Sequence, residues 1–113
     1  MKTTKAAVIA AAEKLGWRVS FEWQKSNRTG KTDKFVEFNQ YTPAGEDFGF
    51  FEFYDRLSDL PRLLMERYQD FDSEKHAAEW YGANNGEPSS LRELLEDAEE
   101  IKKMIYALAI AME

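Results

Sequence analysis

The sequence contains no cysteine and a single histidine, His76, among its 113 residues. The absence of cysteine excludes disulfides, thiolate metal sites and thiol nucleophiles. One imidazole excludes every mechanism that needs two, and the surrounding residues, SEKHAAEW, lack the paired histidines of a zinc-protease helix. The segment NRTGK lacks the upstream glycine of a phosphate-binding loop. We therefore expect no metal, no cofactor and no enzymatic activity.

Long apolar runs are also absent. The first segment, MKTTKAAVIAAAEKLGW, is interrupted by Glu13 and Lys14, and no apolar run approaches the roughly 20 residues of a membrane span. The sequence shows no internal repeat and no low-complexity tract. We expect a single soluble, unprocessed domain over residues 1–113, located in the cytoplasm and without membrane contact.

Charge is unevenly distributed along the chain, whose formal net charge is −6. Residues 1–36 carry a net charge of +5, and the remaining residues carry −11. Such polarity can steer a charged partner, unless folding brings the two regions together so that they cancel.

The first half of the chain predicts one helix and three strands. Apolar residues at helical spacing over residues 4–15, followed by Gly16, predict a short helix. From Trp17 to Trp23 the period changes to two, and the strand-like segments KFVEFNQY and FGFFEFY follow after short loops. This order predicts an antiparallel meander. The third strand has phenylalanines on both faces, so we expect it to be central or covered on both sides.

The second half is predicted to be helical. One helix begins near Ser58, a second follows a cap at Asp72 and stops at Gly82, and a third begins with a capping box at Ser90 and Glu93. The element order is therefore α-β-β-β-α-α-α. We predict an α+β fold of two layers, with an N-terminal helix and three C-terminal helices over a three-stranded antiparallel sheet.

The last helix contains apolar residues that recur every seven positions. They are Leu91, Ala98, Ile105 and Met112 in one series and Leu94, Ile101 and Leu108 in the other. We favour packing within the chain, and the alternative is a homodimer through a coiled coil of this helix. Three heptads are the minimum for a coiled coil, and Ala98 is a weak residue for its seam.

Two carboxylates, Glu46 and Asp47, follow a Pro-Ala-Gly turn between two aromatic segments. Close carboxylates can divide acid and base roles, but adjacent residues of a strand point to opposite faces. Pro43 and Gly45 supply the backbone angles of a sharp turn. We interpret the segment as a structural corner, with a recognition tip as the alternative.

The loop KSNRTGKTDK is basic and lies between the first two strands. A helix, three strands and a helix with such a loop resemble the topology of double-stranded RNA-binding domains, which implies phosphate contacts from Arg28, Lys31 and Lys34. Those domains carry lysines at the start of the next helix, where this chain has Asp55 and Asp59. Nucleic-acid binding is therefore kept as an alternative and not as the main hypothesis.

Two further surfaces are candidates for a protein partner. Acidic residues crowd the last helix, and an array with Glu96, Asp97 and Glu100 could imitate nucleic acid toward a basic enzyme. Aromatic residues are abundant, with eight Phe, five Tyr and three Trp. Most of these fill the core, while the candidates for interface anchors are Trp23, Tyr41, Tyr54, Trp80 and Tyr81.

Three segments in order, QYTPAGEDFGF, DFDSEKHAAEWYGANNG and PSSLRELLEDAEEIKKMIYALA, carry a resemblance. The chain from about residue 35 to residue 110 resembles a family of short, acidic, functionally uncharacterised bacterial proteins often associated with phages, plasmids or integrated elements. The resemblance implies a bacterial accessory protein of mobile-element origin and brings no catalytic residue. The leading hypothesis is a non-enzymatic protein-protein interaction module whose partner the sequence does not name.

Overall fold

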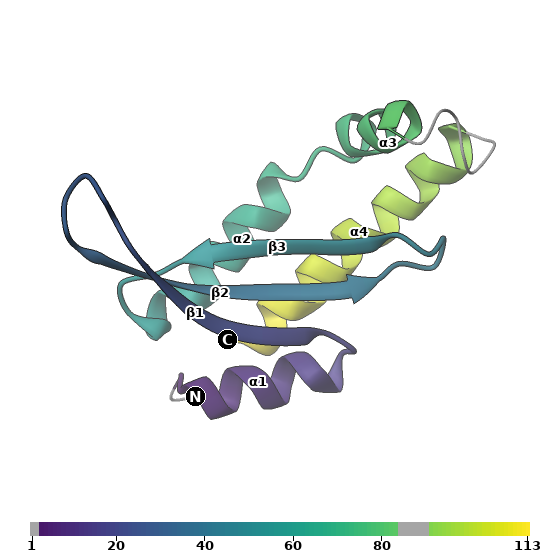
Figure 1. Ribbon diagram of the computed structural model, residues 1–113. Helices are drawn as coiled ribbons and strands as arrows, with labels where there is room; N and C mark the ends of the chain where they lie inside the picture. Colours follow the sequence, from purple (N-terminus) through teal and green to yellow (C-terminus); the bar gives the residue numbers. More distant parts are fainter. Residues whose placement is uncertain (1–2, 84–90) are drawn as a thin grey trace.

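The computed structural model describes residues 3–83 and 91–113. The elements in chain order are α1 (Lys5–Lys14), β1 (Arg18–Lys25), β2 (Thr32–Tyr41), β3 (Asp47–Phe53), the 3-10 helix η1 (Leu57–Asp59), α2 (Leu60–Asp70), α3 (Ser73–Ala83) and α4 (Leu91–Ala111). The predicted α+β order is confirmed (Figure 1). The sheet forms one layer, and α2 and α4 lie behind it in the view of Figure 1.

Helix α1 begins and ends as its sequence predicts. The side chain of Thr4 accepts a hydrogen bond from the Ala7 amide at 3.1 Å, which caps the first turn. Gly16 has φ +93°, a left-handed conformation that lets the chain leave the helix and enter β1. The helix buries Val8 and Ala12, and it contacts β1 and α4.

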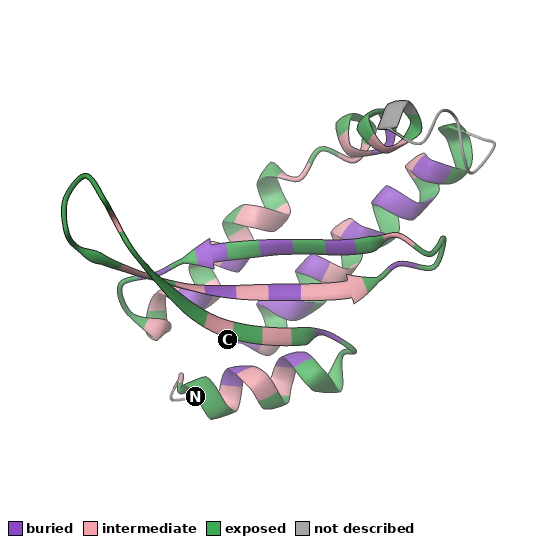
Figure 2. Cartoon of the chain, viewed as in Figure 1, coloured by how far each residue is buried: buried purple, intermediate pink, exposed green. Residues whose placement is uncertain are grey.

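The sheet is antiparallel in the order β1-β2-β3, so β2 is central and β3 is an edge strand. Phe38 in β2 lies opposite Val19 of β1 and Phe50 of β3, and these residues share the face that packs on the helices. The expectation that β3 is central or covered on both sides is wrong. Its residues alternate between buried and exposed along the strand, as Figure 2 shows, because helices cover only one face of it.

The core lies between the inner face of the sheet and helices α2 and α4. Trp17, which precedes β1, packs edge-on against the rings of Phe38, Phe48 and Phe50, with centroids 5.7 to 6.4 Å apart. Full burial of a large apolar side chain stabilises the fold by about 1.5–3 kcal/mol. The fully buried helical residues that face these rings are Leu60, Leu64, Ile101, Ile105 and Leu108.

The heptad residues of α4 pack within the chain. All of them from Leu94 to Met112 are buried, against the sheet, α2 and α3, whereas Leu91 is exposed. The apolar stripe is therefore already covered and leaves no seam for a coiled coil. Ser90, half of the predicted capping box, lies outside the described residues.

Helix α3 packs against α4 and forms a second small cluster there. The Asp72 carboxylate accepts from the Lys75 amide at 3.2 Å, which confirms the predicted cap. The helix continues through Gly82 to Ala83, so the predicted stop at Gly82 is wrong by one residue. No helix in the two described ranges is both long and apolar enough to span a bilayer.

Candidate functional site

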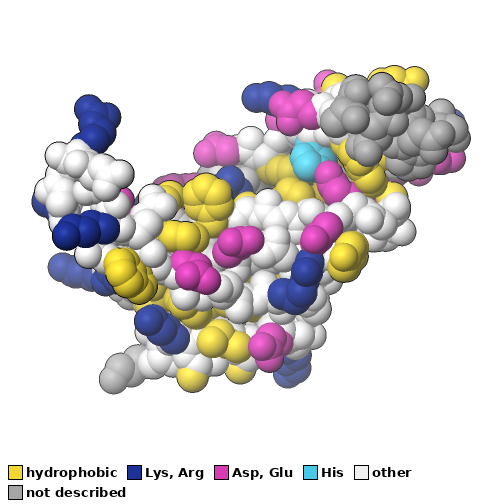
Figure 3. All heavy atoms as spheres, in the orientation of Figure 1, with side chains coloured by type: hydrophobic (Ala, Val, Ile, Leu, Met, Phe, Trp, Pro, Cys, Tyr) yellow, Lys and Arg dark blue, Asp and Glu magenta, His cyan; other side chains and the backbone are white. Residues whose placement is uncertain are grey.

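The outer face of the sheet carries a cluster of three phenylalanines. Phe35 of β2 and Phe51 and Phe53 of β3 have ring centroids 5.3 to 5.8 Å apart. Phe51 is 52% exposed and Phe53 is 46% exposed. Figure 3 looks onto this face and shows apolar side chains gathered over the sheet. We call these three residues the aromatic patch.

The aromatic patch is exposed because of strand geometry. Side chains alternate between faces, so Phe50 and Glu52 point to the helices while Phe51 and Phe53 point away from them. Among the described residues, no helix packs over the outer face (Figure 1). Contiguous apolar side chains on an open sheet face are often part of an interaction surface.

Carboxylates surround the aromatic patch. By strand register, Glu22, Asp33, Glu37 and Asp47 lie on the same outer face. Arg18 is the one basic side chain of the three strands on this face, and it forms an ion pair with Asp47. The outer face therefore combines an apolar centre with excess negative charge, visible in Figure 3.

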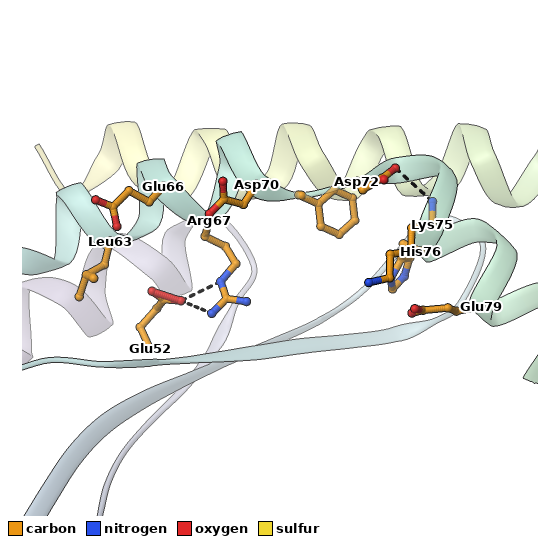
Figure 4. Close-up of a pocket in the computed structure, with 10 residues that line it drawn as sticks. Glu52, Leu63, Glu66, Arg67, Asp70, Asp72, Lys75, His76 and Glu79 are labelled. Atoms are coloured by element: carbon orange, nitrogen blue, oxygen red, sulfur yellow. Dashed lines mark hydrogen bonds and ion pairs between the residues drawn. The ribbon is translucent and has the colours of Figure 1, made fainter.

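A second feature is a groove of about 540 Å³ between β3 and helices α2 and α3 (Figure 4). At one end, Arg67 of α2 makes an ion pair with Glu52 of β3 and donates to the Phe51 carbonyl at 3.1 Å. Burial raises the pKa of Glu52, and the hydrogen bond and charge of Arg67 oppose that rise. Arg67 thus compensates a buried carboxylate and occupies one acceptor on the free edge of β3.

At the other end of the groove, His76 of α3 reaches the corner between β2 and β3. Its Nε2 lies 3.0 and 2.8 Å from the two carboxylate oxygens of Glu46. The imidazole also packs against Phe48 and Phe71, with ring centroids 5.6 and 5.4 Å away. The hydrogen bond to Glu46 raises the pKa of His76, although partial burial opposes this rise.

Two pairs of side chains join elements across the groove. Glu52 is paired with Arg67, and His76 is paired with Glu46. Within the described ranges, no group of three or more histidine or acidic side chains could hold a metal ion. We interpret both pairs as links between the helices and the sheet.

The interpretation of the segment around Glu46 and Asp47 as a corner agrees with its contacts. Glu46 pairs with His76, whereas Asp47 pairs with Arg18 on the outer face, so the two carboxylates diverge. Gly45 has φ +92°, and its amide donates to the Thr42 carbonyl at 2.9 Å. Sequence reasoning missed His76 as the partner of Glu46, because 30 residues separate them along the chain.

The five aromatic residues predicted as interface anchors do not form one patch. Trp23 is 69% exposed near the β1–β2 loop, and Tyr41 is 64% exposed at the far end of β2. Tyr81 is exposed on α3, and Trp80 is half-buried against the α3–α4 cluster. Tyr54 is largely buried, which raises the pKa of its hydroxyl, so it offers little side-chain surface to a partner.

The three acidic residues predicted for mimicry differ in exposure. Asp97 is buried, and its Oδ1 accepts from the Ala44 amide at 3.0 Å. It holds the β2–β3 corner against α4, so the prediction that it faces a partner is wrong. Glu96 and Glu100 are exposed, with Arg92 and Lys103 as their ion-pair partners at 3.5 and 3.0 Å.

The basic residues predicted to contact phosphate lie at the β1–β2 end of the molecule. Arg28 and Lys31 are exposed in the loop, where Gly30 has φ +70°. Lys34 of β2 lies with its Nζ 5.7 Å from the Tyr54 ring centroid and donates to the Asp55 carbonyl at 3.2 Å. These three cations therefore lie on the β1–β2 hairpin, away from the acidic part of α4.

The aromatic patch was not among the residues predicted to bind a partner. The available signal was the presence of phenylalanines on both faces of the third strand, which we interpreted as burial on both sides. No family model, no curated protein and no solved structure matches the chain. The resemblance to short acidic bacterial proteins of mobile elements therefore stays a prediction.

Proposed function

We propose that the protein is a non-enzymatic binding module whose outer sheet face takes an apolar and basic segment of another protein. The observation that supports this proposal is the aromatic patch of Phe35, Phe51 and Phe53 on an uncovered face. Aromatic side chains, phenylalanine among them, are enriched in protein interfaces. Their mutual packing also fixes the rings before binding, which reduces the ordering cost of association.

The charges around the aromatic patch favour a different protein over a second copy of this chain. Two such faces would bring Glu22, Asp33 and Glu37 of one copy toward the same carboxylates of the other. Like charges that meet in an interface disfavour association, whereas Lys or Arg beside apolar anchors would complement them. The partner segment is therefore expected to contain large apolar residues flanked by basic ones.

The proposal predicts the outcome of a peptide-display selection on the immobilised protein. Enriched peptides should combine aromatic or aliphatic residues with Lys or Arg. The double substitution Phe51→Ser and Phe53→Ser should weaken their binding by about 30-fold or more, because truncated anchors often cost about 2 kcal/mol or more. Isothermal titration with a selected synthetic peptide measures the difference.

The matched control is Tyr81→Ser, which removes an exposed aromatic side chain from α3 instead of the sheet. It should leave peptide affinity unchanged. Circular dichroism should show that the double variant folds, since both phenylalanines point away from the core. Peptides that bind the double variant as well as the wild type would refute the proposed site.

A further inference from the structure

Trp23 is the most exposed large apolar side chain of the described residues, with 69% of its surface accessible. It belongs to the inner face of β1, in line with Val19 and Phe21. The twisted β1–β2 hairpin extends beyond the helices there (Figure 1), so none of the described helices covers this end of the face. Single exposed apolar side chains are common on protein surfaces, so the groups that surround Trp23 decide whether it marks a binding site.

Lysines border the exposed indole. Trp23, Lys5 and Lys34 line one recess of about 400 Å³ between the start of α1 and the hairpin. The Nζ of Lys5 lies 5.5 Å from the centroid of the Phe21 ring, which also lines the recess. The aromatic walls therefore position the ammonium groups next to the indole.

Further cations extend from this recess along the hairpin. Lys25, Arg28 and Lys31 are exposed on the end of β1 and in the loop. Figure 3 shows Lys and Arg side chains gathered at this end of the molecule. Two acids are close in sequence, but by register Glu22 and Asp33 belong to the outer face, although Glu22 also reaches the rim of the recess.

We propose that this recess binds single-stranded nucleic acid. Trp23 stacks on one base, Lys5 and Lys34 contact phosphates beside it, and Arg28 and Lys31 contact the strand further along. An aromatic platform within a basic groove is the combination that single strands require, since every base has a face that can stack. Duplex nucleic acid fits less well, because its bases are already stacked on one another.

An anionic membrane is the competing ligand for a surface of Trp and Lys. Membrane-binding loops insert apolar side chains from their tip, whereas the tip of this hairpin, Ser26–Gly30, reads SNRTG and is polar. The indole also lies in a recess and not at the tip. Both features favour a nucleic-acid strand, with a flat base and phosphates on either side of it, over a membrane as the ligand.

The proposed recess and the aromatic patch occupy opposite faces of the sheet. Trp23 shares the inner face with Val36 and Phe38, whereas Phe51 and Phe53 lie on the outer face. The inference therefore goes beyond the proposed protein-binding function, and either can fail without the other. The net charge of −6 opposes association with phosphates, so binding is expected to be weak and strongly dependent on salt.

The test is fluorescence anisotropy of a labelled 12-nucleotide oligo-dT. We expect binding at 50 mM salt within the range of about 1 to 100 μM, and about 50-fold weaker binding at 200 mM if four phosphates are contacted. Trp23→Ala should weaken binding by about tenfold, because one stacked base is lost. Lys31→Gln should make the salt dependence less steep by about 0.7 on a log–log plot.

Matched controls distinguish binding at the recess from nonspecific attraction between the oligonucleotide and other basic or aromatic residues. Tyr81→Ala removes an exposed aromatic residue of α3, and Lys103→Gln removes a cation of α4; both should bind oligo-dT like the wild type. Titration of vesicles containing phosphatidylglycerol tests the competing ligand. Failure to bind oligo-dT at 50 mM salt, equal affinity of Trp23→Ala, or binding to vesicles alone would overturn the proposal.

Discussion

His76 connects three parts of the fold through one side chain. It extends from α3, forms a hydrogen-bonded pair with Glu46 at the β2–β3 corner, and lies between the rings of Phe48 and Phe71. The carboxylates of Glu46, Glu79 and Asp97 all favour its charged form. The protonated imidazole therefore stabilises the contact between α3 and the sheet.

This contact predicts a pH dependence of stability. The pKa of His76 is raised above its ordinary value of 6.5 in the folded state, so its contribution is fully present below that value. The contribution is lost as the pH rises through the higher folded-state pKa. His76→Gln should therefore cost more stability at pH 6 than at pH 9, with a difference on the order of 1 kcal/mol.

Urea unfolding of both proteins at the two pH values measures this difference. Because His76 is the only histidine, no other imidazole contributes to the comparison. Lys75→Gln changes an exposed neighbour and should show no such pH dependence. An equal cost of His76→Gln at pH 6 and pH 9 would contradict the assigned role.

At Gly16 the backbone requires glycine, and an added side chain would also displace the amide of Gln40. Its φ of +93° strains any other residue, and an added Cβ would lie 2.6 Å from Nε2 of Gln40. That amide donates to the Leu15 carbonyl at 3.2 Å, so a side chain at Gly16 would disturb the end of α1 as well. Gly16→Ala should destabilise the protein by about 2–3 kcal/mol.

Gly30 provides the matched control for this substitution. It also has a positive φ, of +70°, but an added Cβ there would meet nothing within 4 Å. Gly30→Ala should cost only the backbone contribution, about 1 kcal/mol. Thermal unfolding of the two variants would contradict this explanation if their midpoints fell equally.

At the scale of the secondary-structure elements, the heptad pattern of α4 has two interpretations: packing within the chain or a coiled-coil dimer. Ala98 packs in a buried cluster with Ala77 of α3 and Leu94, each 1% exposed. The small side chains allow α3 and α4 to approach closely. In a coiled coil, the same Ala98 would be a weak seam position that a larger residue improves.

Ala98→Leu therefore distinguishes the two interpretations. In this structure the larger side chain has no space beside Ala77, so the substitution should destabilise the monomer by about 1–3 kcal/mol. A coiled-coil dimer would instead become more stable. Urea unfolding with light scattering measures both effects, and Ala107→Leu, at an exposed position of α4, should change neither.

Strand β3 shows why an element can be predicted while its environment is not. Its aromatic residues and the turn before it were sufficient to place it, and Asp47–Phe53 agrees with the prediction within one residue at each end. Its position at the sheet edge depends on the partners of β2 and on which face the helices cover. Phenylalanines on both faces of a strand are compatible with two environments: both faces covered, or one face exposed as a patch. The sequence pattern therefore does not distinguish the two.

At the scale of the whole molecule, the fold keeps the charge asymmetry of the sequence. The basic hairpin extends from one end of the sheet, whereas α3 and the first half of α4 lie toward the other end (Figure 1). The basic hairpin loop is therefore separated from the acidic parts of α3 and α4, although Arg18 of β1 pairs with Asp47 on the sheet.

The sequence by itself determined the element order, the antiparallel meander and the turns. These depend on local causes: hydrophobic period, capping residues, and glycines at positive φ, of which Gly16 and Gly45 are examples. Only the tertiary structure decided that Phe51 and Phe53 are exposed, that Asp97 is buried, and that His76 meets Glu46. Each of these depends on which segments, distant in the chain, pack together, and residue pattern does not encode that uniquely.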